Sequence, residues 1–193
     1  MSELAKKKAT YEDLCGIPEN TIGEIVDGEL IVTPRPSRKH ARSAFVLGNK
    51  IGSPYDLGEG GPGGWIFLID PEIGLGEQIV VPDMAGWKRE RFPFEEDHKW
   101  ISAVPDWVCE ILSPSTFRTD KVKKMPIYAH HGVGHIWLIE PVAMTMDAFA
   151  LESGRWVLLA SFAENDKVRA EPFQEIEISL EDLWLGSLQP PRL

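Results

Sequence analysis

The sequence lacks any stretch of roughly 18 apolar residues, which is the length that a membrane-spanning helix needs. It has two cysteines, Cys15 and Cys109, too few for the disulfide scaffold of a small secreted protein. The basic residues 6–8 are not followed by an apolar segment, so we expect no signal peptide. These absences predict a soluble, cytoplasmic protein that makes no contact with a membrane.

Positive charge is also scarce, since 20 Lys and Arg residues face 30 Asp and Glu residues, a formal net charge of −10 at pH 7. This balance excludes a basic architectural nucleic-acid binder. It leaves open a protein that contacts phosphate at one local site through a metal ion. A Gly-rich phosphate loop and the Gly-x-Ser-x-Gly motif of serine hydrolases are both missing, so we expect neither chemistry.

The chain is long enough for one folded domain over residues 1–193, with residues 1–9 expected to be disordered. The apolar patterns and capping signals predict helices over about 10–15, 37–51, 119–131 and 180–185, the last with a Ser179–Asp182 capping box. They predict strands over 65–69, 78–85, 106–112 and 135–139, and hairpins over 24–32 and 144–162. Residues 52–64 are expected to form a loop. The predicted fold class is therefore α/β, in an α+β arrangement with helices flanking strands.

Two carboxylates interrupt the predicted strands, Asp83 in the run 79–85 and Glu110 in the run 107–112. Glu110 projects with Val108 and Leu112 from a strand face that is otherwise apolar, because alternate residues of a strand share a face. Burying a lone carboxylate is unfavourable, so each needs a partner. Either each one bonds to backbone amides of the following turn, or the two share Mg²⁺ or Mn²⁺, which prefer oxygen ligands. We favour the shared metal ion.

The helix predicted over 119–131 supplies positive charge. On a regular α-helix Lys121, Lys124 and Tyr128 share one face, on which they would meet a substrate. The alternative is that Asp120 and Lys124 form an ordinary ion pair on the surface.

Four sequence blocks occur in a characteristic order, namely Glu24–Leu30, Val81–Asp83, Glu110–Thr116 and Asp120–Pro141. Through these blocks the chain resembles the Uma-two family of restriction-endonuclease-like proteins, a branch of the PD-(D/E)XK nuclease superfamily, over about residues 11–162. The resemblance implies a restriction-endonuclease-like core over 10–162, with a central mixed β-sheet, flanking helices and extra antiparallel hairpins. Residues 163–193 would then form a C-terminal extension with a strand and a helix.

The resemblance also implies roles for individual residues. Asp83 matches the Asp of the PD element and Glu110 the (D/E) element, so the two would hold Mg²⁺ or Mn²⁺. The superfamily lysine two residues after the second carboxylate is Leu112 here, and the lysine that this family carries on the following helix corresponds to Lys124. Glu24 matches an N-terminal glutamate of the family, and we expect it to assist catalysis.

A second group of residues is expected to contact the substrate. His40 matches a family histidine near the start of the second helix, and Lys121 and Tyr128 share the helix face of the catalytic lysine. Together these assignments predict a magnesium-dependent endonuclease, a hydrolase that acts on phosphodiester bonds in DNA, with duplex DNA preferred to RNA. We expect a homodimer, because cutting both strands of a duplex takes two active sites.

Two other functions stay open. The acidic net charge, and Pro126 inside the lysine helix, favour a catalytically inactive nucleic-acid-binding or protein-interaction module on the same fold. A small-molecule phosphohydrolase would instead have a closed pocket.

Overall fold

The computed structural model describes residues 8–186, so most of the segment expected to be disordered, and the end of the C-terminal extension, lie outside the described residues. The helices are α1 (Tyr11–Cys15), α2 (Arg38–Ile51) and α3 (Met125–His131), with short π- or 3₁₀-helical segments η1 (Gly52–Asp56), η2 (Arg89–Arg91), η3 (Thr119–Lys124) and η4 (Leu180–Leu183). The strands are β1 (Thr21–Val26), β2 (Glu29–Pro34), β3 (Trp65–Ile69), β4 (Ile73–Leu75), β5 (Gln78–Val80), β6 (Met84–Lys88), β7 (Trp107–Ile111), β8 (His135–Glu140), β9 (Thr145–Glu152), β10 (Arg155–Ala163), β11 (Lys167–Val168) and β12 (Ile178–Ser179).

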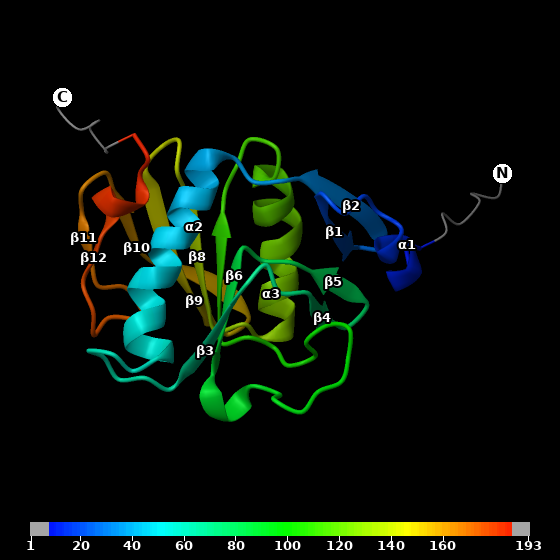
Figure 1. The fold of residues 1–193 in the computed structure, drawn as a ribbon, viewed down its shortest axis with the longest axis horizontal. Helices are drawn as coiled ribbons and strands as arrows, with labels where there is room; N and C mark the ends of the chain where they lie inside the picture. The colour runs from blue at the N-terminus through cyan, green and yellow to red at the C-terminus, as the bar shows by residue number, and fades with distance from the viewer. Residues whose placement is uncertain (1–7, 187–193) are drawn as a thin grey trace.

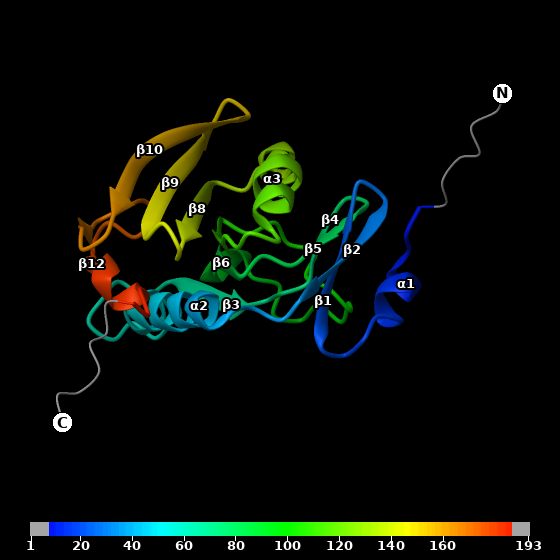
Figure 2. The same cartoon turned by 90° about the horizontal axis from the view of Figure 1, so that it is seen from above.

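A six-stranded sheet forms the centre of the molecule, in the order β10-β9-β8-β7-β6-β3. Its one parallel pair is β7 with β8, and the other neighbours are antiparallel. Helix α2 covers one face of this sheet and α3 the other (Figures 1 and 2). The predicted α/β class, with a mixed sheet flanked by helices and added hairpins, is confirmed.

Strand β7 explains how this sheet is covered on both faces. Trp107, Cys109 and Ile111 pack in the apolar cluster that includes α2, whereas Val108 and Leu112 pack in the cluster that includes α3. This is the alternation expected of a central strand between two helical layers. Glu110 therefore faces the α3 side, as its position in the sequence predicted.

A smaller sheet, in the order β2-β1-β5-β4, lies beside α1 at the end of the molecule near the described N-terminal residues (Figure 1). The β1–β2 hairpin turns at Asp27 and Gly28, whose φ angles are 54° and 75°. Positive φ at both positions is what a two-residue type I′ turn requires, and Asp-Gly supplies it at low cost. The hairpin prediction is confirmed, and it places Glu24 on β1.

The single strand predicted over 78–85 is wrong. The segment is divided into β5, which belongs to the small sheet, and β6, which belongs to the central sheet. Pro82 lies between them and has no N–H for a strand ladder, so pairing stops there. Asp83 consequently lies where the chain crosses from one sheet to the other.

Two other predictions also differ from the structure. The first residues of the predicted loop 52–64 continue α2 as the π-helical turn η1. The predicted C-terminal helix shortens to the 3₁₀ turn η4, and Ser179 makes no side-chain capping bond. Leu180 and Leu183 of this turn are buried in the main core, so packing decides its geometry.

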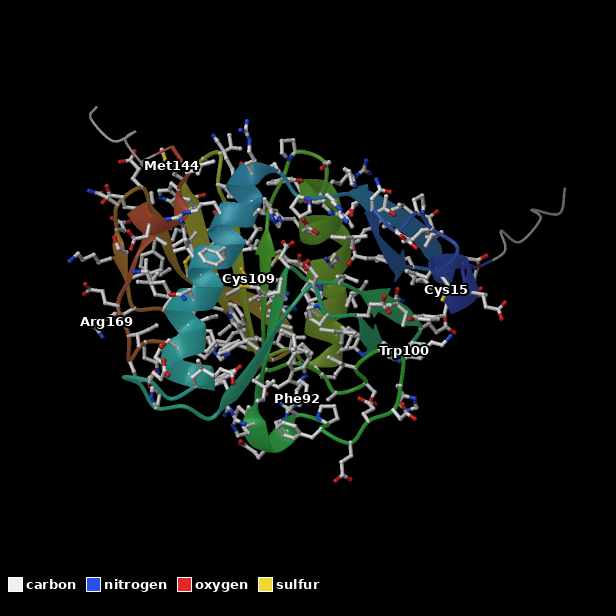
Figure 3. The ribbon with its side chains drawn as sticks, viewed as in Figure 1. Cys15, Phe92, Trp100, Cys109, Met144 and Arg169 are labelled. Carbon is white, nitrogen blue, oxygen red and sulfur yellow. The ribbon has the colours of Figure 1, made fainter. Side chains whose placement is uncertain are left out.

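The two cysteines are free and lie far apart, Cys15 exposed on α1 and Cys109 buried beside α2 (Figure 3). Among residues 8–186, no helix is long and apolar enough to cross a membrane.

Gly86 on β6 provides a test of this packing. A Cβ at this position would lie 2.7 Å from the Phe67 ring and 3.3 Å from the Trp107 ring, which flank it on β3 and β7. We expect Gly86→Ala to lower the free energy of unfolding by roughly 1–3 kcal/mol through overpacking. Urea denaturation measures this change.

Gly52→Ala is the matched control, because nothing lies within 4 Å of its Cβ and its φ of −64° suits alanine. It should leave stability unchanged or raise it by about 0.4–1 kcal/mol. Equal effects of the two substitutions would contradict the packing described here.

Candidate active site

A cavity of about 320 Å³ opens beside the crossing between the two sheets. Its walls come from residues 33–37, which are the end of β2 and its link to α2, and from the loop 113–116 after β7. Besides Arg35, the ionisable side chains that line it are Glu24, His40, Asp83, Glu110, Asp120 and Lys124. Five of these six were assigned to the site from the sequence.

Asp83 and Glu110 lie next to each other across β6 and β7. The antiparallel register pairs Met84 with Cys109. Asp83 precedes Met84 and Glu110 follows Cys109, so these two residues are neighbours at the end of the ladder. Asp83 Oδ2 accepts a hydrogen bond of 2.6 Å from the Ile111 backbone N–H, and Asp83 Oδ1 lies 2.9 Å from His40 Nε2. The side chain therefore extends the β6–β7 pairing beyond the end of β6.

Glu110 is held from α3 and from η3. Its Oε1 atom accepts a hydrogen bond of 2.5 Å from the Tyr128 hydroxyl and lies 2.9 Å from Lys124 Nζ. Both partners belong to the segment that follows β7, so the chain leaves the strand and folds back over its own carboxylate. The structure thus brings Tyr128 and Lys124 to Glu110.

Lys124 is almost completely buried and makes four contacts. Its Nζ atom lies 2.9 Å from Glu24 Oε1 and 3.6 Å from Asp120 Oδ1, in addition to Glu110, and it donates a bond of 3.1 Å to the Val81 carbonyl. Pro126 does not displace the lysine, because it lies in the first turn of α3, where a missing N–H is tolerated.

Lys121 does not join the site. Its ammonium lies 4.7 Å from the centre of the Phe117 ring, and it is not among the residues that line the cavity. The predicted face assumed an α-helix, but η3 is a π-helix, in which each residue turns through a smaller angle, so positions three apart diverge. Along this segment Val122 is 63% exposed while Lys124 is 2% exposed.

Asp120 is the site residue that sequence reasoning missed. The alternative of a surface Asp120–Lys124 pair is wrong, because Asp120 is 4% exposed and lines the cavity. The sequence signal that could have identified Asp120 is its position four residues before Lys124, which was already assigned to the site. Residues at this spacing are neighbours on a helix, so burial of the lysine buries the aspartate with it.

The site holds more negative than positive charge. Burial, together with the neighbouring carboxylates, raises the pKa of Glu110 well above its usual range despite the opposing effect of Lys124. Burial likewise raises the pKa of Asp120 to about 6. Burial alone would lower the pKa of Lys124, but Glu110 and Glu24 outweigh it and raise that pKa, so the ammonium stays charged. The Lys124 ammonium is therefore paired with three buried carboxylates.

His40 is a further cation of the site when it is protonated. Burial lowers its pKa, but the hydrogen bond and the charge of Asp83 outweigh that effect, so the net shift is upward.

The donor set suits a hard divalent cation. Within residues 8–186, no three His, Cys, Asp or Glu side chains form a ready-made metal cage. Mg²⁺ does not need one, because it binds through one or two carboxylates and completes its shell with water and phosphate oxygens. Asp83 and Glu110 provide such a pair, and a cation there would offset the excess negative charge.

The model of the Uma2 family, described as "Putative restriction endonuclease", matches residues 9–181. The chain belongs to the Uma2 family. The match reaches beyond residue 162, so most of the C-terminal extension is part of the Uma2 unit.

A solved structure shares the fold. A crystal structure from Anabaena variabilis, described as a putative nuclease belonging to DUF820, matches this Uma2 protein with a TM-score of 0.70. The match covers 93% of this chain and 99% of that chain at 24% identity, which shows a common fold. No curated protein matches the chain.

The raised pKa of Asp120 predicts a dependence of stability on pH. An unfolded aspartate titrates near 3.9, so between about pH 4 and pH 6 the folded protein binds the proton that the unfolded chain has lost. The contribution of Asp120 to the free energy of unfolding therefore falls by roughly 2 kcal/mol as the pH rises across that window. Asp120→Asn should remove this contribution, which urea denaturation at a series of pH values measures.

Asp97→Asn replaces an exposed aspartate and is the control, which should reproduce the wild-type pH profile. If Asp120→Asn did the same, the described burial of Asp120 would be wrong.

Proposed function

We propose that the protein is a metal-dependent endonuclease that hydrolyses phosphodiester bonds in DNA. The observation that carries this proposal is the placement of Asp83 and Glu110 side by side at the cavity, with Lys124 Nζ 2.9 Å from Glu110. Two carboxylates beside one lysine form a set that can bind a metal ion and a phosphate together. The description of the Uma2 family supports nucleic acid as the substrate.

Asp83 and Glu110 would hold the Mg²⁺ or Mn²⁺ ion. Such an ion, when bound, polarises the phosphoryl group and lowers the pKa of a water molecule that it carries. His40 orients Asp83 through the contact at 2.9 Å, and Tyr128 orients Glu110 through its hydroxyl. These two residues therefore position the metal ligands.

Lys124 supplies fixed positive charge for the phosphate, on which negative charge grows during hydrolysis. Glu24 assists by holding this ammonium, and its Oε1 atom also accepts a hydrogen bond of 2.7 Å from the Val81 N–H. The lysine is thus held from two sides before substrate arrives, which is the preorganisation that catalysis needs.

Calorimetry with Mg²⁺ and Mn²⁺, followed by a DNA cleavage assay, tests the proposal. The wild type should bind metal, and the double variant Asp83→Ala with Glu110→Ala should not. Cleavage should stop in EDTA, and Lys124→Met should slow it by roughly 10²-fold or more. The double variant Glu95→Ala with Asp97→Ala, which alters two exposed carboxylates, should bind and cleave as the wild type does.

Other results would redirect the assignment. No metal binding by the wild type, even with DNA present, would contradict the proposal and favour an inactive nucleic-acid-binding or interaction module. Hydrolysis of a phosphomonoester without cleavage of DNA would favour a small-molecule phosphohydrolase.

We also propose a homodimer that pairs through β10. This nine-residue strand ends the central sheet, and no strand of residues 8–186 pairs with its outer edge. It exposes Val157, Leu158 and Leu159 in succession. An open apolar edge strand is a template for another strand, and a second copy of β10 would complete it symmetrically.

Sedimentation measurements test this interface. The wild type should sediment as a dimer, and Leu158→Lys should shift it towards the monomer, since a charge on an edge strand opposes pairing. Leu57→Lys changes another exposed leucine and should keep the dimer. A monomeric wild type would contradict the homodimer.

A further inference from the structure

A second hollow, of about 350 Å³, adjoins the catalytic cavity. The two share Ser113 and Pro114, so they lie on either side of the loop that follows β7. The other residues that line the hollow are Leu112, Phe117, Glu140 and Val142. A nucleic-acid strand that crosses this loop with a phosphate in the cavity would bring a neighbouring group of the same strand into the hollow.

The hollow is apolar and carries an aromatic ring. Phe117 is 42% exposed and Val142 is 61% exposed, although both are large apolar side chains. The Lys121 ammonium lies over the Phe117 ring, 4.7 Å from its centre, so positive charge adjoins the aromatic surface. An aromatic ring beside a cation is the combination that binds single-stranded nucleic acid, because the ring stacks on a base and the cation meets the backbone.

Glu140 gives the hollow its one carboxylate. It ends β8, next to Ile139, whose carbonyl accepts a hydrogen bond of 2.7 Å from the Leu112 N–H. Among residues 8–186, no side chain forms an ion pair or hydrogen bond with the Glu140 carboxylate. An ionised carboxylate only accepts hydrogen bonds, so its partner on the major-groove edge of a base is the exocyclic amino group of cytosine or adenine, where thymine and guanine present carbonyl oxygens.

We propose that this hollow is a subsite for an unpaired nucleobase that carries an exocyclic amino group on its major-groove edge, as cytosine and adenine do. The inference rests on the proposed function and narrows its substrate to DNA with an unpaired nucleotide beside the scissile phosphate. Phe117 and Val142 contact the base, Glu140 accepts from its amino group, and Lys121 contacts the backbone. A base stacked in an intact duplex donates its amino group to its partner and must first be flipped out.

Cleavage rates on single-stranded DNA test the subsite. The wild type should cleave oligo-dC and oligo-dA about five-fold faster than oligo-dT, and all of them faster than a blunt duplex. Glu140→Gln should remove the preference over oligo-dT, because an amide can also donate to the thymine carbonyl. Phe117→Leu should raise KM about ten-fold for every single strand and leave the preference and kcat in place.

Two substitutions serve as controls. Glu152→Gln changes an exposed carboxylate at the end of β9, and Phe94→Leu changes an exposed aromatic side chain elsewhere. Both should behave as the wild type does. If the wild type cleaves DNA but Glu140→Gln leaves its base preference unchanged, the subsite is wrong and the nuclease assignment stands.

If the wild type cleaves no DNA, a binding experiment tests the subsite separately from the nuclease proposal. Fluorescence anisotropy then compares labelled oligo-dC with oligo-dT on the wild type and on Glu140→Gln. Tighter binding of oligo-dC that depends on Glu140 would support the subsite although the nuclease proposal had failed. Equal binding of the two oligonucleotides, or a preference that survives Glu140→Gln, would overturn it.

Discussion

The buried ammonium of Lys124 is the contact on which the rest of the site depends. It joins Glu24 from the small sheet, Glu110 from the central sheet and Asp120 from its own helical segment. Each of these carboxylates is buried, and without the lysine each would be an unpaired charge in a low-dielectric interior. The same contact therefore holds the two sheets together at the cavity and assembles the charged groups there.

A buried ion network of this kind is weak evidence for stability. Replacing a buried ion network by apolar side chains of similar size is often neutral or stabilising. Here burial, together with the neighbouring carboxylates, raises the pKa of Glu110 and of Asp120, which is a standing electrostatic strain. Such strain is characteristic of functional sites, where a ligand of opposite charge relieves it. In the proposed function a divalent cation supplies this opposite charge, and the phosphodiester binds beside the cation.

Local sequence signals correctly predicted the features whose geometry is set by residues close together in the sequence. The Asp27-Gly28 turn, the buried strand β7 and the opposite faces of Cys109 and Glu110 all follow from turn chemistry and strand alternation. The family resemblance assigned roles to Asp83 and Lys124 and added Glu24 and His40, and the structure brings all four to the cavity. Lys121 was misplaced, because a regular helix was assumed where η3 is a π-helix.

The sequence by itself determined the fold class, the carboxylate on the apolar face of β7 and most of the ionisable side chains that line the cavity. Only the tertiary structure decided that β5 and β6 belong to different sheets, that Asp120 is buried with Lys124, and that Phe117 and Glu140 share a hollow beside the cavity. The physical reason is the range of the interactions. Alternation, capping and turns act over a few residues, whereas sheet membership and charge burial depend on segments that meet only in the folded chain.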